Sequence, residues 1–208
     1  MSALRAAARA LFGEYEIYRI YARRLERDEA DVAPPAGVRL GTLDDGAAMA
    51  LAEDAALRSL SGCAGEGAHG FGAWSGDALA AVCWFWVGER YAKRNFWPLA
   101  DGEAKLVEIM SAFAYRGRGI AGALLKFSCR GMALRGYRAA YARVWHSNVP
   151  SIRLFEADGW KYIAWVAHLH PFGRKKPIRI VRRIGGPVLA PHSSAPPMSS
   201  DGGSTQSG

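Results

Sequence analysis

The pattern of hydrophobic and polar positions divides the chain into a periodic N-terminal segment, a long mixed region and a polar tail. In residues 3–30, large apolar and aromatic residues recur at three- and four-residue steps with charges between them, at Leu4, Leu11, Tyr15, Tyr18, Tyr21 and Leu25. This spacing predicts an amphipathic helix. The following stretch DVAPPAG (31–37) predicts a linker, because its prolines and glycine interrupt both helix and strand. We therefore assign 1–36 to an added helix and linker, and 185–208 to a low-complexity, disordered tail.

Residues 37–184 form the predicted domain, in which strands and helices follow one another. Apolar runs predict strands over 38–43, 71–74, 78–88, 104–112, 138–146, 161–170 and 177–184. Predicted helices cover 44–60, where Asp44 or Asp45 could be the cap, then about 119–136, then a short segment after Asn148 that Gly159 ends. The order is β-α-β-β-β-α-β-α-β-β, an α/β (α+β) domain with a mixed sheet of about seven strands. The central strand–loop–helix unit implies parallel neighbours there and antiparallel hairpins elsewhere.

Composition is typical of a globular domain without disulfides. The chain has 208 residues, half of them hydrophobic. Its longest apolar run, 78–87, is shorter than the roughly 20 residues of a membrane span. The first residues lack the long apolar core of a secretory signal. Three widely spaced cysteines give neither a disulfide framework nor a zinc pattern, so we expect a cytoplasmic protein without a metal.

The formal net charge of +8 is unevenly placed. Seven basic residues and no acidic one lie in 116–143, and six more without an acid lie in 172–184, whereas residues 1–31 carry six of each sign. Two such blocks suggest an anionic ligand, a nucleic acid or an acidic membrane face, or else a solvated basic surface.

A glycine cluster, AYRGRGIAGALL (114–125), separates the central strand from its helix. The first turn of a helix offers free N–H groups and the positive end of its dipole, and glycines let an anion approach the backbone. The stretch matches neither GxxxxGK[ST] nor GxGxxG, so no nucleotide fingerprint applies. It is either an anion cradle or a tight turn without a ligand.

Two motifs together resemble the GNAT superfamily of acyl-CoA-dependent N-acetyltransferases. Arg116 to Ala121 matches that family's Gln/Arg-x-x-Gly-x-Gly/Ala loop, and Asn148 to Trp160 is similar to its Asn-x6-Tyr-x3-Gly-Phe segment. The resemblance covers about 38–184 and implies direct transfer of an acetyl group from acetyl-CoA to an amine.

The resemblance also implies roles for particular residues. The backbone of Ile109, Met110 and Ser111 would pair with the pantetheine arm, and one N–H there would polarise the thioester carbonyl. Asn148 would bond the arm where two central strands separate. The pyrophosphate would lie on the loop, formed by Arg116, Gly117, Arg118, Gly119, Ile120, Ala121 and Gly122.

The chain departs from the family pattern at the acid and the base. The family's frequent general acid, a tyrosine, falls on Phe155, which we expect to be core; Tyr162 or Tyr141 could substitute. Two bases are open: Glu108, inside the central strand where it could also face the surface, and His146, at the end of the next strand. A strand carboxylate in this family tends to lie earlier, where this chain has Lys105.

Several alternatives remain on the sequence alone. His168 and His170 share one strand face but lack a third metal ligand. Besides an enzyme, the chain could be a non-catalytic acyl-CoA-binding GNAT-fold module, or a basic protein that binds nucleic acid or a membrane surface; we expect no nucleic-acid partner. We expect coenzyme A and an unidentified amine as partners, a monomer or homodimer, and an acceptor shaped by the helix after the first strand, the 88–103 connection and the PFGRKKP turn.

Overall fold

One sheet of eight strands organises the described part of the molecule, a computed structural model that describes residues 14–28, 30–43, 49, 52–92, 95–170 and 178–185. The elements are β1 (Glu14–Arg24), β2 (Val38–Leu43), α3 (Ala55–Arg58), η1 (Ser61–Cys63), β3 (Ala68–Ser75), β4 (Ala78–Trp86), α4 (Gly88–Ala92), β5 (Glu103–Ser111), η2 (Phe113–Tyr115), α5 (Ile120–Leu134), β6 (Ala139–Trp145), α6 (Val149–Ala157), β7 (Lys161–His170) and β8 (Ile178–Arg183). The strand order is β2-β3-β4-β5-β6-β1-β7-β8. The expected mixed sheet is confirmed, with one strand more than the sequence predicted.

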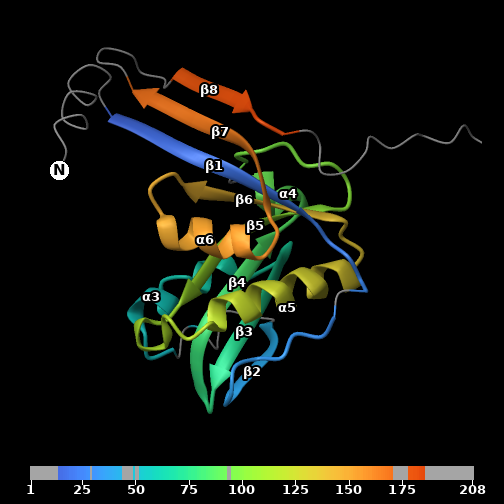
Figure 1. The fold of residues 1–208 in the computed structure, drawn as a ribbon, viewed down its shortest axis with the longest axis vertical. Helices are drawn as coiled ribbons and strands as arrows, with labels where there is room; N and C mark the ends of the chain where they lie inside the picture. Colours follow the sequence, from blue (N-terminus) through green and yellow to red (C-terminus); the bar gives the residue numbers. More distant parts are fainter. Residues whose placement is uncertain are drawn as a thin grey trace, which may run out of the picture.

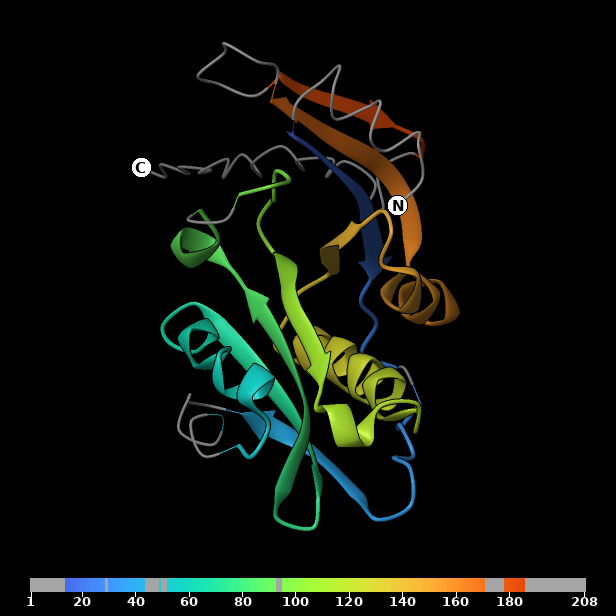
Figure 2. The same cartoon turned by 90° about the vertical axis from the view of Figure 1, so that its left-hand side faces the viewer.

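Within the described sheet, β5 and β6 are the parallel pair, and the other neighbours are antiparallel. Helices α5 and α6 lie on one face (Figure 1), while α3 lies on the other face of the β2–β5 half (Figure 2). The buried apolar residues of β3–β6 pack on α5, at Leu124, Leu125 and Met132 among others. A second cluster joins β4 to Leu57 of α3 and Tyr91 of α4. The core therefore fills both faces of the sheet.

The predicted N-terminal helix over 3–30 is wrong. Residues 14–24 form strand β1, which inserts between β6 and β7 and pairs antiparallel with both, while residues 1–13 lie outside the described part. Ile20, Tyr21 and Ala22 are consecutive and fully buried. A strand that is covered on both faces does not show the two-residue alternation of apolar and polar residues that identifies strands. The remaining pattern was the three- and four-residue spacing of the aromatic residues, which is typical of a helix.

The shorter predicted helices have mixed outcomes. Helix α3 covers four residues and is capped by the Asp54 carboxylate, which accepts the N–H of Ala56 at 2.8 Å; Asp44 and Asp45 lie outside the described residues. The predicted connection 88–103 contains the additional helix α4. Helix α6 confirms the expected cap, since the Asn148 side chain accepts the N–H of Ser151 at 3.3 Å. The PFGRKKP turn and nearly all of the predicted tail lie outside the described residues.

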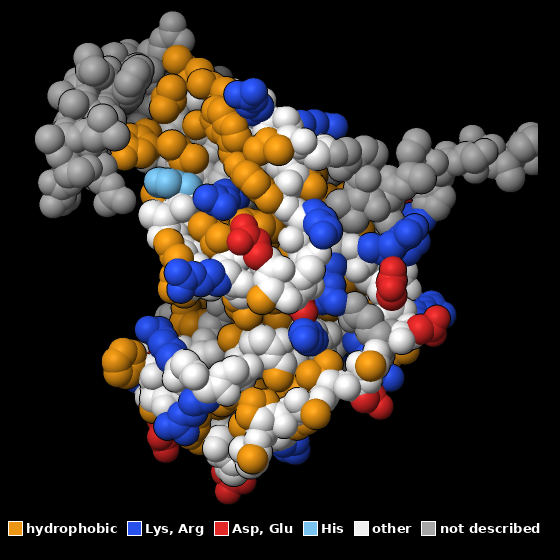
Figure 3. All heavy atoms as spheres, viewed as in Figure 1, with side chains coloured by type: hydrophobic (Ala, Val, Ile, Leu, Met, Phe, Trp, Pro, Cys, Tyr) orange, Lys and Arg blue, Asp and Glu red, His pale blue; other side chains and the backbone are white. Residues whose placement is uncertain are grey.

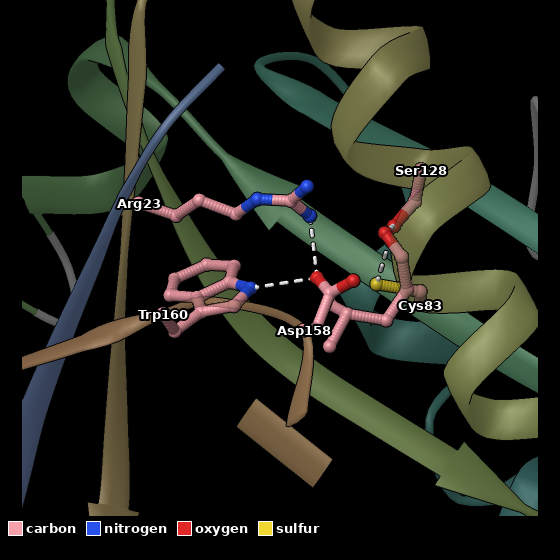
Figure 4. A network of polar contacts seen from close by, with 6 residues as sticks. Arg23, Cys83, Ser128, Asp158 and Trp160 are labelled. Carbon is pink, nitrogen blue, oxygen red and sulfur yellow. Dashed lines mark hydrogen bonds and ion pairs between the residues drawn. The ribbon is translucent and has the colours of Figure 1, made fainter. Parts of the chain in front are cut away.

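A buried ion pair joins β1 to the end of α6 (Figure 4). Arg23 donates to the Asp158 carboxylate, and the side chains are 13% and 3% exposed. The Trp160 indole N–H donates to the same carboxylate oxygen at 3.1 Å. On the same face of β1, the Tyr21 hydroxyl donates to Glu156 at 2.8 Å. These contacts hold the inserted strand against the α6 segment.

Replacing Arg23 by alanine should lower the free energy of unfolding by about 3 kcal/mol, because it removes one partner of a buried pair and leaves a carboxylate in the core. Arg24→Ala is the matched control, because Arg24 is the next strand residue and is exposed; we expect a change below about 0.5 kcal/mol there. Chemical denaturation at pH 7 measures both. Equal losses in the two variants would contradict the proposed role of the pair.

Candidate functional site

The loop before α5 has an open, left-handed backbone. Gly117 and Gly119 have φ of +73° and +76°, values that L side chains rarely adopt, and a Cβ built at either position would meet nothing within 4 Å. Within the described residues, no side chain caps the helix at Gly119, whose carbonyl accepts the N–H of Ala123 at 3.1 Å. The start of α5 thus lacks a side-chain cap among the described residues, as an anion site at a helix N-terminus requires.

Basic side chains surround this loop. In Figure 3, Lys and Arg side chains gather where the chain enters α5. Arg116 donates to the Ser111 carbonyl at 3.3 Å, and Arg118 lies over the Tyr115 ring at 5.4 Å. A hollow of about 430 Å³ continues from the helix start, lined by Gly119, by Gly122 and Lys126 of α5, by Leu154 of α6 and by residues 32–35. The loop thus combines free backbone donors, positive charge and room for an elongated ligand.

Strands β5 and β6 separate beside this loop. They pair only from Glu103–Ala139 to Leu106–Ala142, and Figure 2 shows them diverging beyond that point. A register shift in β5 lies between Leu106 and Glu108. Beyond it, Ile109, Met110 and Ser111 pair with β4 on one side, and their other edge has no partner in the described ladder with β6. This free edge can pair with an extended ligand.

The two predicted bases lie on either side of this gap. Glu108 is half-buried in β5, opposite Trp84 of β4. His146 follows β6 and is half-buried, with Nδ1 at 3.1 Å from the Ile17 carbonyl oxygen. If Nδ1 donates to that carbonyl, Nε2 is the nitrogen that can accept a proton. The inserted strand β1 therefore orients the imidazole, a contact that the sequence analysis missed.

The residues considered as acids are engaged elsewhere. Phe155 is 2% exposed and packs between Tyr21 and Trp160, with ring centres at 5.9 and 4.9 Å, so it is core, as expected. The Tyr141 hydroxyl donates to Glu103 at 2.8 Å, and burial, assisted by this carboxylate, raises the pKa of Tyr141 well above its usual range. Burial also raises the pKa of Tyr162, which lies beneath Arg19.

The comparisons with known proteins decide the family. The model of the GNAT acetyltransferase family matches residues 38–160, more than half of the chain and inclusive of the glycine loop, the β5–β6 gap and α6. The chain belongs to the GNAT acetyltransferase family. No curated protein matches it.

Solved GNAT structures share the fold at low sequence identity. A GCN5-related N-acetyltransferase from Sphaerobacter thermophilus has a TM-score of 0.54 at 19% identity, over 81% of this chain and 56% of that one. A tandem GNAT protein from the clavulanic acid biosynthesis pathway has a TM-score of 0.54 at 20% identity, over 85% of this chain and 61% of that one. A GCN5-related N-acetyltransferase from Kribbella flavida has a TM-score of 0.51 at 14% identity, over 78% of this chain and 60% of that one. The chain thus spans less than two thirds of the length of these relatives.

This GNAT domain has a second, larger cleft of about 670 Å³. It is lined by Tyr18 and Ile20 of β1, Arg143 of β6, Val166 and His168 of β7, Arg179 of β8, and Ala92, Asn95 and Phe96 of the 88–103 connection. The connection was expected to shape the acceptor site; the strand residues were not, because only the sheet order brings them together. His168 Nδ1 lies 3.5 Å from a Glu16 carboxylate oxygen, and the described residues contain no cluster suited to a metal. None of the described helices is long and apolar enough to cross a membrane.

Lys105 is buried beside this cleft. Its side chain is inaccessible, and Nζ has no hydrogen-bond partner among the described residues. Three aromatic rings face the amine, with centres at 3.6 Å for Phe96, 4.7 Å for Tyr91 and 5.5 Å for Tyr141. Burial lowers the pKa of Lys105 to about 6, with Glu103 opposing and Arg143 adding to the effect. Burial therefore favours the neutral form of this amine, whereas the ring faces favour the charged form.

Lys105 should make the stability of the protein depend on pH. Between about pH 6 and 10 the unfolded chain keeps a proton on this amine that the folded chain has lost, so the free energy of unfolding rises with pH. Between pH 6.5 and pH 8.5, the free energy of unfolding of the wild type should rise by about 2 to 3 kcal/mol more than that of Lys105→Met. The slope is about 1.36 kcal/mol for each pH unit and each proton released. Denaturant titrations at the two pH values measure this difference; parallel profiles would contradict a neutral lysine.

Proposed function

We propose that the protein is an acyl-CoA-dependent N-acyltransferase that transfers an acetyl group from acetyl-CoA to an amine by direct attack. The observation that supports this most is the glycine loop at the start of α5, which opens beside the gap between β5 and β6. Free first-turn N–H groups and neighbouring cations fit a pyrophosphate. The unpaired edge of β5 fits the amide-bearing pantetheine arm.

Each residue group then has a part in the reaction. The backbone from Gly117 to Gly122, with Arg116 and Arg118, would bind the pyrophosphate. The backbone of Ile109, Met110 and Ser111 would align the arm, and an N–H near the register shift would stabilise the negative charge that develops on the thioester oxygen. Asn148 already caps α6 through its oxygen, so its amide N–H groups are the atoms that would contact the arm.

Proton transfer is the remaining step. We propose that Glu108 removes the proton of the attacking amine, because it is a half-buried carboxylate at the point where β5 leaves β6. His146 is the alternative base. Since Phe155 is core, the departing sulfur has no protein acid at that position. A thiol with a pKa of about 8.5 can leave as thiolate and take a proton from water. A non-catalytic acyl-CoA-binding module is the second candidate function, and the buried Phe155 is the observation that favours it.

Coenzyme A should raise the melting temperature, because it binds the native state preferentially. Gly119→Ala should raise the dissociation constant of coenzyme A at least about tenfold. The added Cβ strains a residue with a left-handed backbone and occupies space that the pyrophosphate would fill. Gly76→Ala is the matched control: Gly76 has φ of +58° and an equally open Cβ direction, in the distant β3–β4 turn. Calorimetric titration of both variants measures the effect. No melting shift at millimolar ligand, or equal affinity in both variants, would contradict the assignment.

Glu108→Gln should lower kcat/KM by about 100-fold or more and remove the acidic limb of the pH–rate profile, as expected for loss of a general base. His146→Asn provides the comparison, with kcat/KM within about tenfold of wild type. Release of free thiol from acetyl-CoA, with amines as acceptors, measures both. The reverse ranking would transfer the role to His146. No amine-dependent thiol release in the wild type would favour the binding module.

A further inference from the structure

The large cleft contains two arginines that are held in place without a carboxylate. The Arg143 guanidinium lies 4.3 Å from the centre of the Tyr18 ring and 5.3 Å from that of Phe96. Arg179 Nη2 donates to the Phe96 carbonyl at 3.3 Å. Ring faces and one carbonyl therefore position both side chains, and most of their N–H donors have no acceptor among the described residues.

The acidic groups near the cleft are engaged with other partners. Glu16 lies beside His168, at 3.5 Å. Glu103 accepts the Tyr141 hydroxyl and the N–H of Ala100, both at 2.8 Å. Within the described residues, neither Arg143 nor Arg179 forms an ion pair. The cleft consequently carries two guanidinium groups that form no direct ion pair with a carboxylate of the described residues.

The position of Arg143 connects the cleft to the reaction site. Leu106–Ala142 is the last pair of the β5–β6 ladder, so Arg143 is the first β6 residue beyond the point where the strands separate. A ligand held by its guanidinium would therefore be anchored to the strand that borders the gap in which we place the thioester.

We propose that the cleft selects amine acceptors that also carry an anionic group, a carboxylate or a phosphate, and that Arg143 and Arg179 bind this group. The proposal rests on the proposed acyl-transfer function and names the class of acceptor. Planar guanidinium groups bind carboxylates and phosphates with paired hydrogen bonds, and such bonds are stronger than neutral ones. A polyamine would meet like charges in the same cleft, so polycationic acceptors are disfavoured.

Matched acceptors test the proposal. β-Alanine is compared with β-alaninamide, phosphoethanolamine with ethanolamine, and a dipeptide with a free C-terminus with its amidated form; spermidine represents polycations. We expect kcat/KM for at least one anionic member to exceed that of its neutral partner by about 10- to 100-fold, in line with charge-assisted hydrogen bonds. The carboxylate and phosphate pairs show which anion is preferred.

Variants assign the preference to the arginines. Arg143→Gln and Arg179→Gln should each reduce the ratio of anionic to neutral kcat/KM towards one, mainly through KM for the anionic member. Arg143→Lys should retain part of the ratio, because it keeps the charge and loses the planar fork. Arg39→Gln is the matched control, since Arg39 is also exposed and lies 4.3 Å from the centre of an aromatic ring, Trp74, but on the distant strand β2; its ratio should equal that of the wild type.

The outcomes separate this proposal from the function on which it rests. Equal or better use of every neutral partner would overturn the anionic subsite, and so would a ratio that both glutamine variants leave unchanged. If none of the tested amines is acetylated although coenzyme A still binds in calorimetry, the anionic subsite would also be overturned, while the cofactor site would stand. Absence of coenzyme A binding would overturn the proposed function itself and this proposal with it.

Discussion

The separation of β5 from β6 is the constraint on which the rest of the site depends. A strand that leaves its neighbour exposes backbone donors and acceptors, which are costly to leave unpaired. Here β5 keeps β4 as its partner up to Ser111, and β6 keeps β1 up to Trp145. The inserted strand therefore satisfies the backbone of β6 on its outer edge, so β6 can diverge from β5 without losing both partners.

Strand β1 also connects the parts of the site through its two faces. Tyr18 and Ile20 line the large cleft on one face. On the other face, Tyr21 packs on Phe155, and Arg23 pairs with Asp158 at the end of α6. The backbone of β1 holds His146 through the Ile17 carbonyl. Although it lies outside the family match, β1 contacts a candidate base, the core and the large cleft.

The features that could be predicted from the sequence are those with a local cause. Glycines before α5 and an asparagine before α6 act within a few residues of themselves, so the loop, both helices and the strand between them were predicted correctly. Strand β1 was not, because burial on both faces removed its alternation and its partners lie more than a hundred residues away. The cleft could not be predicted either: Tyr18, Arg143 and Arg179 meet only through the order of β6, β1, β7 and β8.

The features that the family match covers are largely the local ones, and the features outside it depend on the order of the strands. The family match, 38–160, contains the glycine loop and the free edge of β5, where recognition uses backbone groups that many sequences can supply. Five of the nine residues lining the cleft lie outside it, on β1, β7 and β8. The proposed backbone recognition of the acyl donor is therefore compatible with wide sequence divergence, whereas the proposed recognition of the acceptor depends on side chains such as Arg179 that the match does not include. Family membership thus indicates the type of reaction, whereas the proposed choice of acceptor rests on the charge and shape of the cleft in this chain.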